Sequence, residues 1–303
     1  MLESKNIAVV VPAYNEAALI RGTLQSVPSF VDHIIVVDDA STDATIEAAK
    51  TAGRPFELIR HEVNQGVGAA IATGCRHALR LGAEFTAVMA ADGQMHPADL
   101  PSLLAPLVAG EADYVKGNRL SCPTVRRAMP WHRWLGNLLF SSLTRRALGV
   151  DVQDSQCGYA AMNRRTKQTL DWDRLWKGYG YPNDLLAWLS SFGLRVRDVP
   201  VRAVYGDEQS GIRLYHVALV IPFYVILVQT QLQGELSILG WLIIANGLAS
   251  SLSAPLIGKL ADRGSRNVMA GAALLAGVVG IVTWYVSSYH ADLKFGISTA
   301  VIV

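Results

Sequence analysis

The chain has 303 residues, a formal net charge of +2 and a mean hydropathy of +0.26. That length leaves room for two modest domains, and the small net charge, without a basic tract interleaved with aromatic residues, gives no indication of a nucleic-acid partner. Cys75, Cys122 and Cys157 form no Cys-x-x-Cys pair, which argues against a disulfide framework and against a zinc site.

Short apolar strands alternate with helical segments over the first third of the chain. No positively charged region leading into an apolar run precedes them, so we expect no cleavable signal peptide and a first half that stays in the cytosol. Ser41 or Thr42 is expected to cap the helix that starts near Asp43. The alternation predicts an α/β fold with right-handed βαβ units and a parallel sheet covered on both faces. The expected strands are 7–11, 34–37, 56–60 and 85–89, and the expected helices are 16–27, 43 onward, 66–81 and 100–109.

The pattern is looser between residues 110 and 211. The sequence predicts a strand over 113–116, helices over 134–148 and 184–192, and a late strand over 194–201. The polar, glycine-bearing section 205–213 is typical of a domain boundary. We therefore expect a cytosolic domain over 1–212 and a second domain over 213–303.

The second domain contains three long stretches without acidic or basic residues, at 214–234, 237–258 and 267–289. Each exceeds the roughly 20 residues that a helix needs to cross the hydrocarbon core. We expect about three transmembrane helices and the start of a fourth. The loop with Lys259, Arg263 and Arg266 would then return to the cytosol, as the positive-inside rule requires. The predicted location is a multi-pass membrane protein with the first domain on the cytoplasmic face.

Polar residues cluster where the predicted strands end, at 12–16, 37–43, 64–70 and 88–97. Carboxylates after two separate strands suit the recognition of base amides and ribose hydroxyls. Gly66 and Gly68, at a helix start, let backbone N–H groups approach a ligand closely. Asp92 supplies a hard oxygen ligand for Mg²⁺ or Mn²⁺, with a diphosphate completing the shell. Together these residues predict a nucleotide-diphosphate site.

These blocks resemble family 2 glycosyltransferases, and among them the polyprenyl-phosphate (dolichyl-phosphate mannose synthase-like) branch, over about residues 5–213. The resemblance implies a nucleotide-diphospho-sugar transferase (GT-A, Rossmann-like) domain followed by α-helical transmembrane segments. It implies a nucleotide-sugar donor, a polyprenyl-phosphate acceptor and a membrane partner. The residues implied to hold the nucleotide are Pro12, Tyr14, Glu16 and Asp39, and those implied to bind the metal are Asp92 and Gln94.

The resemblance also implies a reaction centre. Gly117-Asn118-Arg119 stands where this branch has a phosphate-binding Gly-Ser-Arg, and Arg133 matches a second phosphate-binding arginine. The block that begins at Asp154 matches a block near the reaction centre. The implied catalytic residues are Asp92, Arg119, Arg133 and Asp154. The chain departs from the family pattern at three positions, which are Ala90 in place of an Asp, Asn137 in place of a Ser and Ala160 in place of a basic residue.

The expected reaction moves a hexose from a GDP- or UDP-sugar to a polyprenyl (dolichyl or undecaprenyl) phosphate. A sugar carbon leaving a diphosphate passes through an oxocarbenium-like state, and the metal and the arginines stabilise the charge that grows on the leaving phosphate. A lipid monophosphate, with a second pKa near roughly 6, is already a nucleophile at neutral pH. No strong general base is then required, and one displacement inverts the anomeric centre.

Two alternatives remain open. Beside the polyprenyl-phosphate reaction, one alternative is a family 2 enzyme with another glycan or lipid acceptor, and the other is a transporter-derived membrane protein with a nucleotide-sugar-binding domain. The second alternative arises because 258–266 is similar to the loop between the second and third helices of major facilitator transporters. The second domain thus resembles an opening fragment of such a transporter. Among the histidines, His96 is expected either to mark a helix entry with Pro97 or to bind a metal, and His61 is expected to be a surface or packing residue.

Overall fold

The structure is a computed structural model that describes residues 5–122, 125 and 129–202, the side chains of 131–133 excepted. The chain divides into two compact units, Met1–Ile212 and Arg213–Val303. The stretches at 214–289 that we expect to cross the membrane lie outside the described residues. Within the described part, no helix has the length and apolar character needed to span a bilayer.

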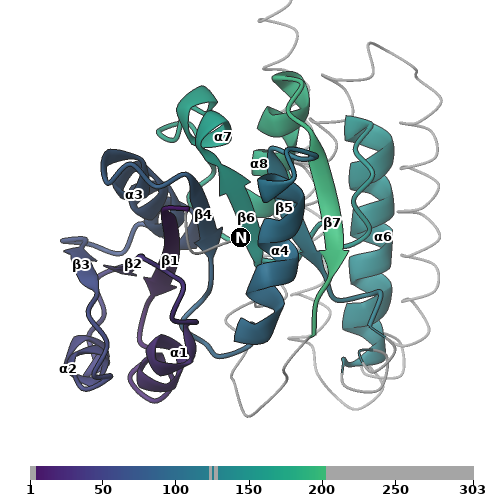
Figure 1. Cartoon of the computed structure of the whole chain (residues 1–303). Helices are drawn as coiled ribbons and strands as arrows, with labels where there is room; N and C mark the ends of the chain where they lie inside the picture. Colours follow the sequence, from purple (N-terminus) through teal and green to yellow (C-terminus); the bar gives the residue numbers. More distant parts are fainter. Residues whose placement is uncertain (1–4, 123–124, 126–128, 203–303) are drawn as a thin grey trace, which may run out of the picture. The chain divides into compact units, whose positions relative to one another are not determined.

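The first unit is built on a seven-stranded sheet with the strand order β3-β2-β1-β4-β6-β5-β7 (Figure 1). Neighbouring strands are parallel except at β6, which runs antiparallel to both β4 and β5. The strands are β1 (Ile7–Ala13), β2 (His33–Asp38), β3 (Glu57–Arg60), β4 (Phe85–Val88), β5 (Tyr114–Asn118), β6 (Ala160–Asn163) and β7 (Val196–Pro200).

Helices connect most of these strands. The described helices are α1 (Ile20–Ser26), α2 (Thr45–Lys50), α3 (Val67–Arg80), the 3-10 turn η1 (Pro97–Asp99), α4 (Leu100–Val108), α6 (Trp131–Leu148), α7 (Arg164–Thr169) and α8 (Tyr181–Ser191). Each strand and helix expected between residues 7 and 201 is present, with boundaries shifted by a few residues. The α/β class is therefore confirmed.

The core lies on both faces of β1, as its continuous apolar run predicts. Successive side chains of a strand point to opposite faces. Val9 shares one core cluster with Leu24 of α1 and Leu103 of α4. Val10 points to the other face, where it meets Gly74 of α3. Helices on the two faces thus leave the strand ends as the accessible part of the sheet.

The expectation of a wholly parallel sheet is wrong at β6. This strand pairs Ala160 with Val88 of β4 and with Lys116 of β5 in antiparallel register. Its four residues, Ala-Ala-Met-Asn, include no β-branched side chain, so they carry little of the local preference that marks a strand. Tertiary pairing between two existing strands, rather than propensity, makes β6 a strand.

The helix caps near the second strand also differ from expectation. The Ser41 hydroxyl accepts from the backbone N–H of Asn15 at 2.9 Å instead of capping a helix. The Asp43 carboxylate accepts from the backbone N–H of Thr45, the first residue of α2, at 3.0 Å. Ser41 therefore links the loop after β1 to the loop after β2, and Asp43 accepts the hydrogen bond from the first backbone N–H of α2.

Gly74 allows α3 to lie directly on β1. A Cβ at Gly74 would stand 2.3 Å from Cγ1 of Val10, a stiff β-branched residue. We predict that Gly74→Ala destabilises the chain by about 1–3 kcal/mol through overpacking, although alanine is the better helix former. Gly22→Ala in α1 is the control, because no atom lies within 4 Å of its added Cβ. That change should stabilise by about 0.5–1 kcal/mol. Equal effects of the two substitutions in denaturant titrations would contradict this packing.

Candidate functional site

The predicted site residues gather at the carboxyl ends of β1, β2 and β4. The chain runs from β1 to β2 on one side and returns to place β4 on the other side of β1. In open α/β sheets such a switch in strand order leaves a crevice in which ligands bind. Pro12 and Ala13 are the last two residues of β1 and still pair with β2, whereas the pairing of β1 with β4 has already stopped at Val88. The topology thus joins the 12–16 block to the 88–97 block.

Asp39 lies just after β2 and is held in a cradle of hydrogen-bond donors. Its Oδ1 accepts from the backbone N–H of Gln65 at 2.9 Å, and its Oδ2 accepts from the backbone N–H of Gly66 at 2.7 Å. His61 Nδ1 lies 2.6 Å from the same Oδ1. A buried carboxylate is stable only when it is satisfied in this way. Asp39 therefore fixes the loop that follows β3.

His61 is a residue of the site that the sequence did not reveal. It is buried, and its Nε2 lies 3.0 Å from the hydroxyl of Thr73 on α3. An ionised carboxylate only accepts, so Nδ1 must donate to Asp39. The expectation that His61 is a packing residue at most is thus incomplete, because its two nitrogens link Asp39 to α3. Its sequence spacing from Asp39 follows no motif that would have indicated this contact.

Hydrogen bonds join the loop after β1 to the loop after β2. Asn15 and Ala40 adopt left-handed backbone conformations, with φ of 57° and 62°. Asparagine tolerates this region because its short side chain bonds locally, and here Asn15 Oδ1 accepts from the backbone N–H of Thr42 at 2.8 Å. The backbone of Glu16 donates to the Thr45 hydroxyl at 2.8 Å. Tyr14 and Glu16, on either side of Asn15, are thereby presented at the crevice, with Tyr14 exposed.

Glu16 and Asp92 form the acidic part of the site. Burial, followed by the negative charges of Asp92 and Asp43, raises the pKa of Glu16 to about 7. The backbone N–H of Gln94 donates to Asp92 Oδ1 at 3.0 Å, which turns the chain so that Asp92 and Gln94 lie in one short loop. No cluster of three or more His, Cys, Asp or Glu side chains suited to a metal occurs among the described residues. Any cation here would take further oxygen ligands from a substrate.

Ala90 contributes a backbone contact to this loop. Its N–H donates to the sulfur of Met95 at 3.2 Å. His96 Nδ1 accepts from the backbone N–H of Ala98 at 3.2 Å and caps η1, with Pro97 as the first residue of that turn. The helix-entry interpretation of His96 is confirmed. The position that would complete an Asp-x-Asp clamp is occupied by a methyl group, and the acidic neighbour of Asp92 is Glu16.

Gly66 and Gly68 are in contact with protein backbone. The N–H of Gly68 donates to the carbonyl of Lys177 at 2.7 Å, and the N–H of Gly66 is held by Asp39. A Cβ on Gly68 would lie 2.1 Å from the carbonyl oxygen of Trp176. The expectation that these two N–H groups approach a ligand is therefore not supported by the geometry. Both glycines are needed because the segment 176–178 packs against the start of α3.

The segment 176–178 leads into two tyrosines, Tyr179 and Tyr181, that lie near Glu16 and Asp92. The backbone N–H of Trp176 donates to Asp184 Oδ2 of α8 at 2.7 Å, which anchors the segment at its start. Burial and the charge of Glu16 raise the pKa of Tyr179, which places its phenol near Glu16. Burial is also the first cause that raises the pKa of Tyr181, and Asp92 adds to it. The two tyrosines, one in α8 and one in the segment before it, therefore lie within electrostatic range of the carboxylates, and the sequence pattern did not identify them.

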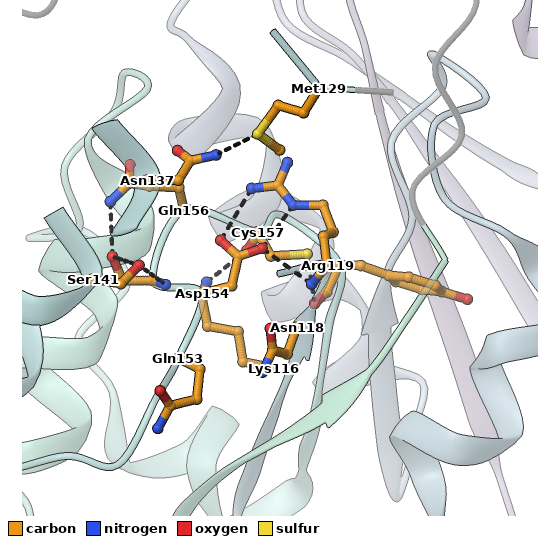
Figure 2. A network of polar contacts seen from close by, with 12 residues as sticks. Lys116, Asn118, Arg119, Met129, Asn137, Ser141, Gln153, Asp154, Gln156 and Cys157 are labelled. Carbon is orange, nitrogen blue, oxygen red and sulfur yellow. Dashed lines mark hydrogen bonds and ion pairs between the residues drawn. The ribbon is translucent and has the colours of Figure 1, made fainter. Parts of the chain in front are cut away.

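Arg119 and Asp154 form one unit (Figure 2). Arg119 Nε donates to Asp154 Oδ2 at 2.8 Å, and Nη2 donates to Oδ1 at 3.1 Å. Asp154 is fully buried, so the pair holds the guanidinium in a fixed plane. Close by, Lys116 Nζ donates to the carbonyl of Cys157 at 2.6 Å, and burial lowers the pKa of Lys116 to about 8. These contacts tie the block that begins at Asp154 to the end of β5.

The remaining predicted residues are placed less completely. Arg133 lies in the first turn of α6, and its side chain is outside the described residues. Asn137, two turns into the same helix, donates from Nδ2 to the sulfur of Met129 at 3.4 Å. Ala160 is buried in β6. The structure thus brings together Glu16, Asp39 and Asp92 at one edge, with the Arg119–Asp154 pair at the end of β5.

Comparison with known proteins identifies the family of this chain. The family model described as Glycosyl transferase family 2 matches residues 8–169. A dolichyl-phosphate N-acetylglucosaminyltransferase of Methanococcus voltae, which uses UDP-N-acetylglucosamine, is 30% identical over 68% of this chain and 88% of its own length. An undecaprenyl-phosphate mannosyltransferase of Micrococcus luteus is 32% identical over 65% of this chain and 83% of its own.

The fold also matches solved structures. Glucosyl-3-phosphoglycerate synthase from Mycobacterium tuberculosis, in complex with Mn²⁺, UDP and phosphoglyceric acid, superposes with a TM-score of 0.56 at 22% identity. The match covers 76% of this chain and 81% of that one. At this identity the likeness establishes the fold, a GT-A-like mixed sheet.

The raised pKa of Glu16 gives a stability prediction. Its folded-state pKa of about 7 exceeds the ordinary value of 4.5, so the native state binds the proton more tightly and loses stability as pH rises between those values. Glu16→Gln should remove this loss. The variant is expected to be more stable than the parent at pH 8 by at most about 1 kcal/mol, because a half-exposed carboxylate is screened, and equal to it near pH 4. Denaturant titrations across this range measure the effect. Glu62→Gln, at an exposed position, is the control, and a pH-independent difference for Glu16→Gln would contradict the assignment.

Proposed function

The chain belongs to glycosyl transferase family 2 and is a glycosyltransferase, and from that premise we propose that it moves a hexose or hexosamine from a GDP- or UDP-sugar to a polyprenyl phosphate. One observation carries the donor half of this proposal. Burial, followed by the neighbouring charge of Asp92, raises the pKa of Glu16 at the switch point to about 7. A cation with a bound diphosphate would relieve that repulsion.

The ligand chemistry of this edge fits Mg²⁺ or Mn²⁺. Both ions prefer oxygen ligands, and Mg²⁺ is commonly held by one or two carboxylates plus substrate phosphates. Asp92 and Gln94 would hold the ion, which would stabilise negative charge on the leaving diphosphate. Glucosyl-3-phosphoglycerate synthase has been solved with Mn²⁺ and UDP and with Mg²⁺ and UDP. We infer a similar metal dependence for this chain.

The protein's own cation at the reaction centre is Arg119. Asp154 engages Nε and Nη2 and keeps the guanidinium in one orientation, so little side-chain freedom is lost when a phosphate binds. Arg119 would bind a phosphate of the donor or of the acceptor, and Asp154 would position it. Arg133, from the start of α6, is proposed as the second phosphate-binding arginine on the strength of the sequence motif.

The acceptor class rests on the relatives. Those that match over most of their length include enzymes named for transfer to dolichyl phosphate and to undecaprenyl phosphate. A phosphate monoester is largely ionised at neutral pH and attacks without a strong base. The uncharged stretches between 214 and 289 support a membrane location. We propose that the catalytic unit works on the cytoplasmic face.

A transfer assay tests this function. Membranes that carry the full-length chain are incubated with labelled GDP-mannose, UDP-glucose or UDP-N-acetylglucosamine and with polyprenyl phosphate, with and without EDTA. We expect labelled lipid with at least one donor and its loss in EDTA. Membranes without the protein are the control. No labelled lipid with any donor would overturn the proposed function.

The metal assignment predicts the effect of a single substitution. Asp92→Asn keeps the size of the side chain and removes its charge, so transfer should fall by about 100-fold or more, the range seen when one electrostatic contact is lost. Asp171→Asn, at an exposed carboxylate far along the chain from the crevice, should retain full activity. Initial rates of lipid labelling measure both. Full activity in Asp92→Asn would show that Asp92 does not hold the metal.

A further inference from the structure

Lys116 places a charged side chain in the interior of the sheet. It lies in β5, every residue of which is buried, and is itself 1% exposed. In the sheet it pairs with Ala160 of β6 and with Asp198 of β7. Burial lowers its pKa to about 8, so at neutral pH it is still mostly an ammonium. A buried ammonium destabilises the fold unless a partner satisfies it, so the partner of this ammonium determines what it does.

The partner of Lys116 is the backbone of the segment 153–159, which carries Asp154 (Figure 2). Nζ donates to the carbonyl of Cys157 at 2.6 Å. The ends of the segment are held by two other hydrogen bonds, from the N–H of Gln153 to Asp198 Oδ2 at 2.7 Å and from the N–H of Gly117 to the carbonyl of Tyr159 at 2.8 Å. Lys116 thus fixes the middle of the segment, between these two contacts.

Asp154 depends on this segment for its position. Its side chain is fully buried, and its two oxygens accept from the backbone N–H, Nε and Nη2 of Arg119 at 3.1, 2.8 and 3.1 Å. The backbone carbonyl of Asp154 accepts from the N–H of Cys157 at 3.4 Å. Residues 154–157 therefore form one turn, and Lys116 holds the far end of that turn. A displacement of Cys157 would move Asp154 and, with it, the plane of the Arg119 guanidinium.

We propose that Lys116 is a positioning residue of the reaction centre, whose ammonium holds the Cys157 carbonyl and thereby keeps Asp154 and Arg119 in the orientation that binds a phosphate. The inference rests on the proposed function, in which Arg119 binds a phosphate of the donor or of the acceptor. Such positioning affects the rate strongly, because a misplacement of about 1 Å at a reaction centre can cost about 100-fold. Lys116 acts through the turn 154–157 and not by contact with the reacting atoms.

Loss of the proton from Lys116 would weaken this contact, because a neutral amine donates a weaker hydrogen bond than an ammonium. Burial lowers the pKa of Lys116, the neighbouring Cys157 and Asp154 raise it again in part, and Arg119 opposes them. Burial raises the pKa of three further titratable groups near this end of β5, which are Cys157, Asp198 and Tyr181. The thiol and the phenol thus ionise above their ordinary range, and Lys116 is the group of this cluster that loses its proton near pH 8.

The pH dependence of transfer tests the inference. The maximal rate of lipid labelling is measured at pH 7, 8 and 9 with membranes that carry the full-length chain, at saturating donor and polyprenyl phosphate. A group with a pKa of about 8 passes from roughly nine-tenths to one-tenth protonated over this range, so we expect the rate to fall at least about threefold. The thermal midpoint of the purified chain should not fall over the same range. The pKa of Lys116 lies below its ordinary value of 10.5, so the unfolded state binds more protons and stability rises with pH.

Two results would contradict the positioning role and leave the proposed function standing. One is a rate that is flat or rises from pH 7 to pH 9, and the other is a rate that falls together with the thermal midpoint. No labelled lipid at any pH would overturn both the positioning role and the proposed function.

Two variants separate Lys116 from a second buried lysine. Lys116→Met removes the charge and the donor, so the maximal rate at pH 7 should be about tenfold lower than in the parent and should not fall further by pH 9. Lys167→Met is the matched control, because Lys167 is also 1% exposed and burial lowers its pKa to about 8. Its Nζ donates to the carbonyl of Ala83 and the hydroxyl of Thr86, at the start of β4 and away from Asp154. This variant should keep both the rate of the parent at pH 7 and its fall by pH 9.

The parent's fall in rate, if it persisted in a folded Lys116→Met variant or disappeared in Lys167→Met, would overturn the assignment to Lys116. The pH profiles of the parent and of Lys167→Met decide the question whether or not Lys116→Met folds.

Discussion

The buried carboxylate of Asp39 is the contact on which the rest of the site depends. A charge this deeply buried is tolerated because two backbone N–H groups and His61 satisfy it. The same bonds attach the end of β2 to the loop after β3 and, through Thr73, to α3. Removal of any one partner would leave a buried charge partly unsatisfied, so the local fold and the recognition site share a single network.

A second constraint follows from that network. Because Gly66 is held against Asp39, the start of α3 lies close to the segment 176–178, and only glycine fits at positions 66 and 68. The segment then brings Tyr179 towards Glu16. Burial and the charge of Asp92 together disfavour the ionised form of Glu16 and raise its pKa. The unfavourable burial of this charge lowers the stability of the fold at the place where a cation and a diphosphate are proposed to bind. Such perturbed groups are common at functional sites.

The sequence predicted the structure correctly where the local preference of a segment agrees with its tertiary contacts. The apolar runs of β1 and β2 and the polar residues that follow them predicted both the strands and the carboxylates at their ends. It was insufficient where a contact joins distant segments. β6 is a strand because of its neighbours, Gly68 serves a packing contact with Trp176, and His61 lies 22 residues from its partner Asp39. Arg119 and Asp154 were both predicted as site residues, but nothing in their spacing showed that they pair.

The most direct test of this arrangement is the structure of the full-length chain with UDP and Mn²⁺ bound. We predict that the base lies against Asp39 while His61 stays on Oδ1. The diphosphate should lie against Asp92 and Gln94, with the nucleoside crossing the end of β1. A nucleotide bound away from the carboxyl ends of β1, β2 and β4, or a base that makes no contact with Asp39, would contradict the account.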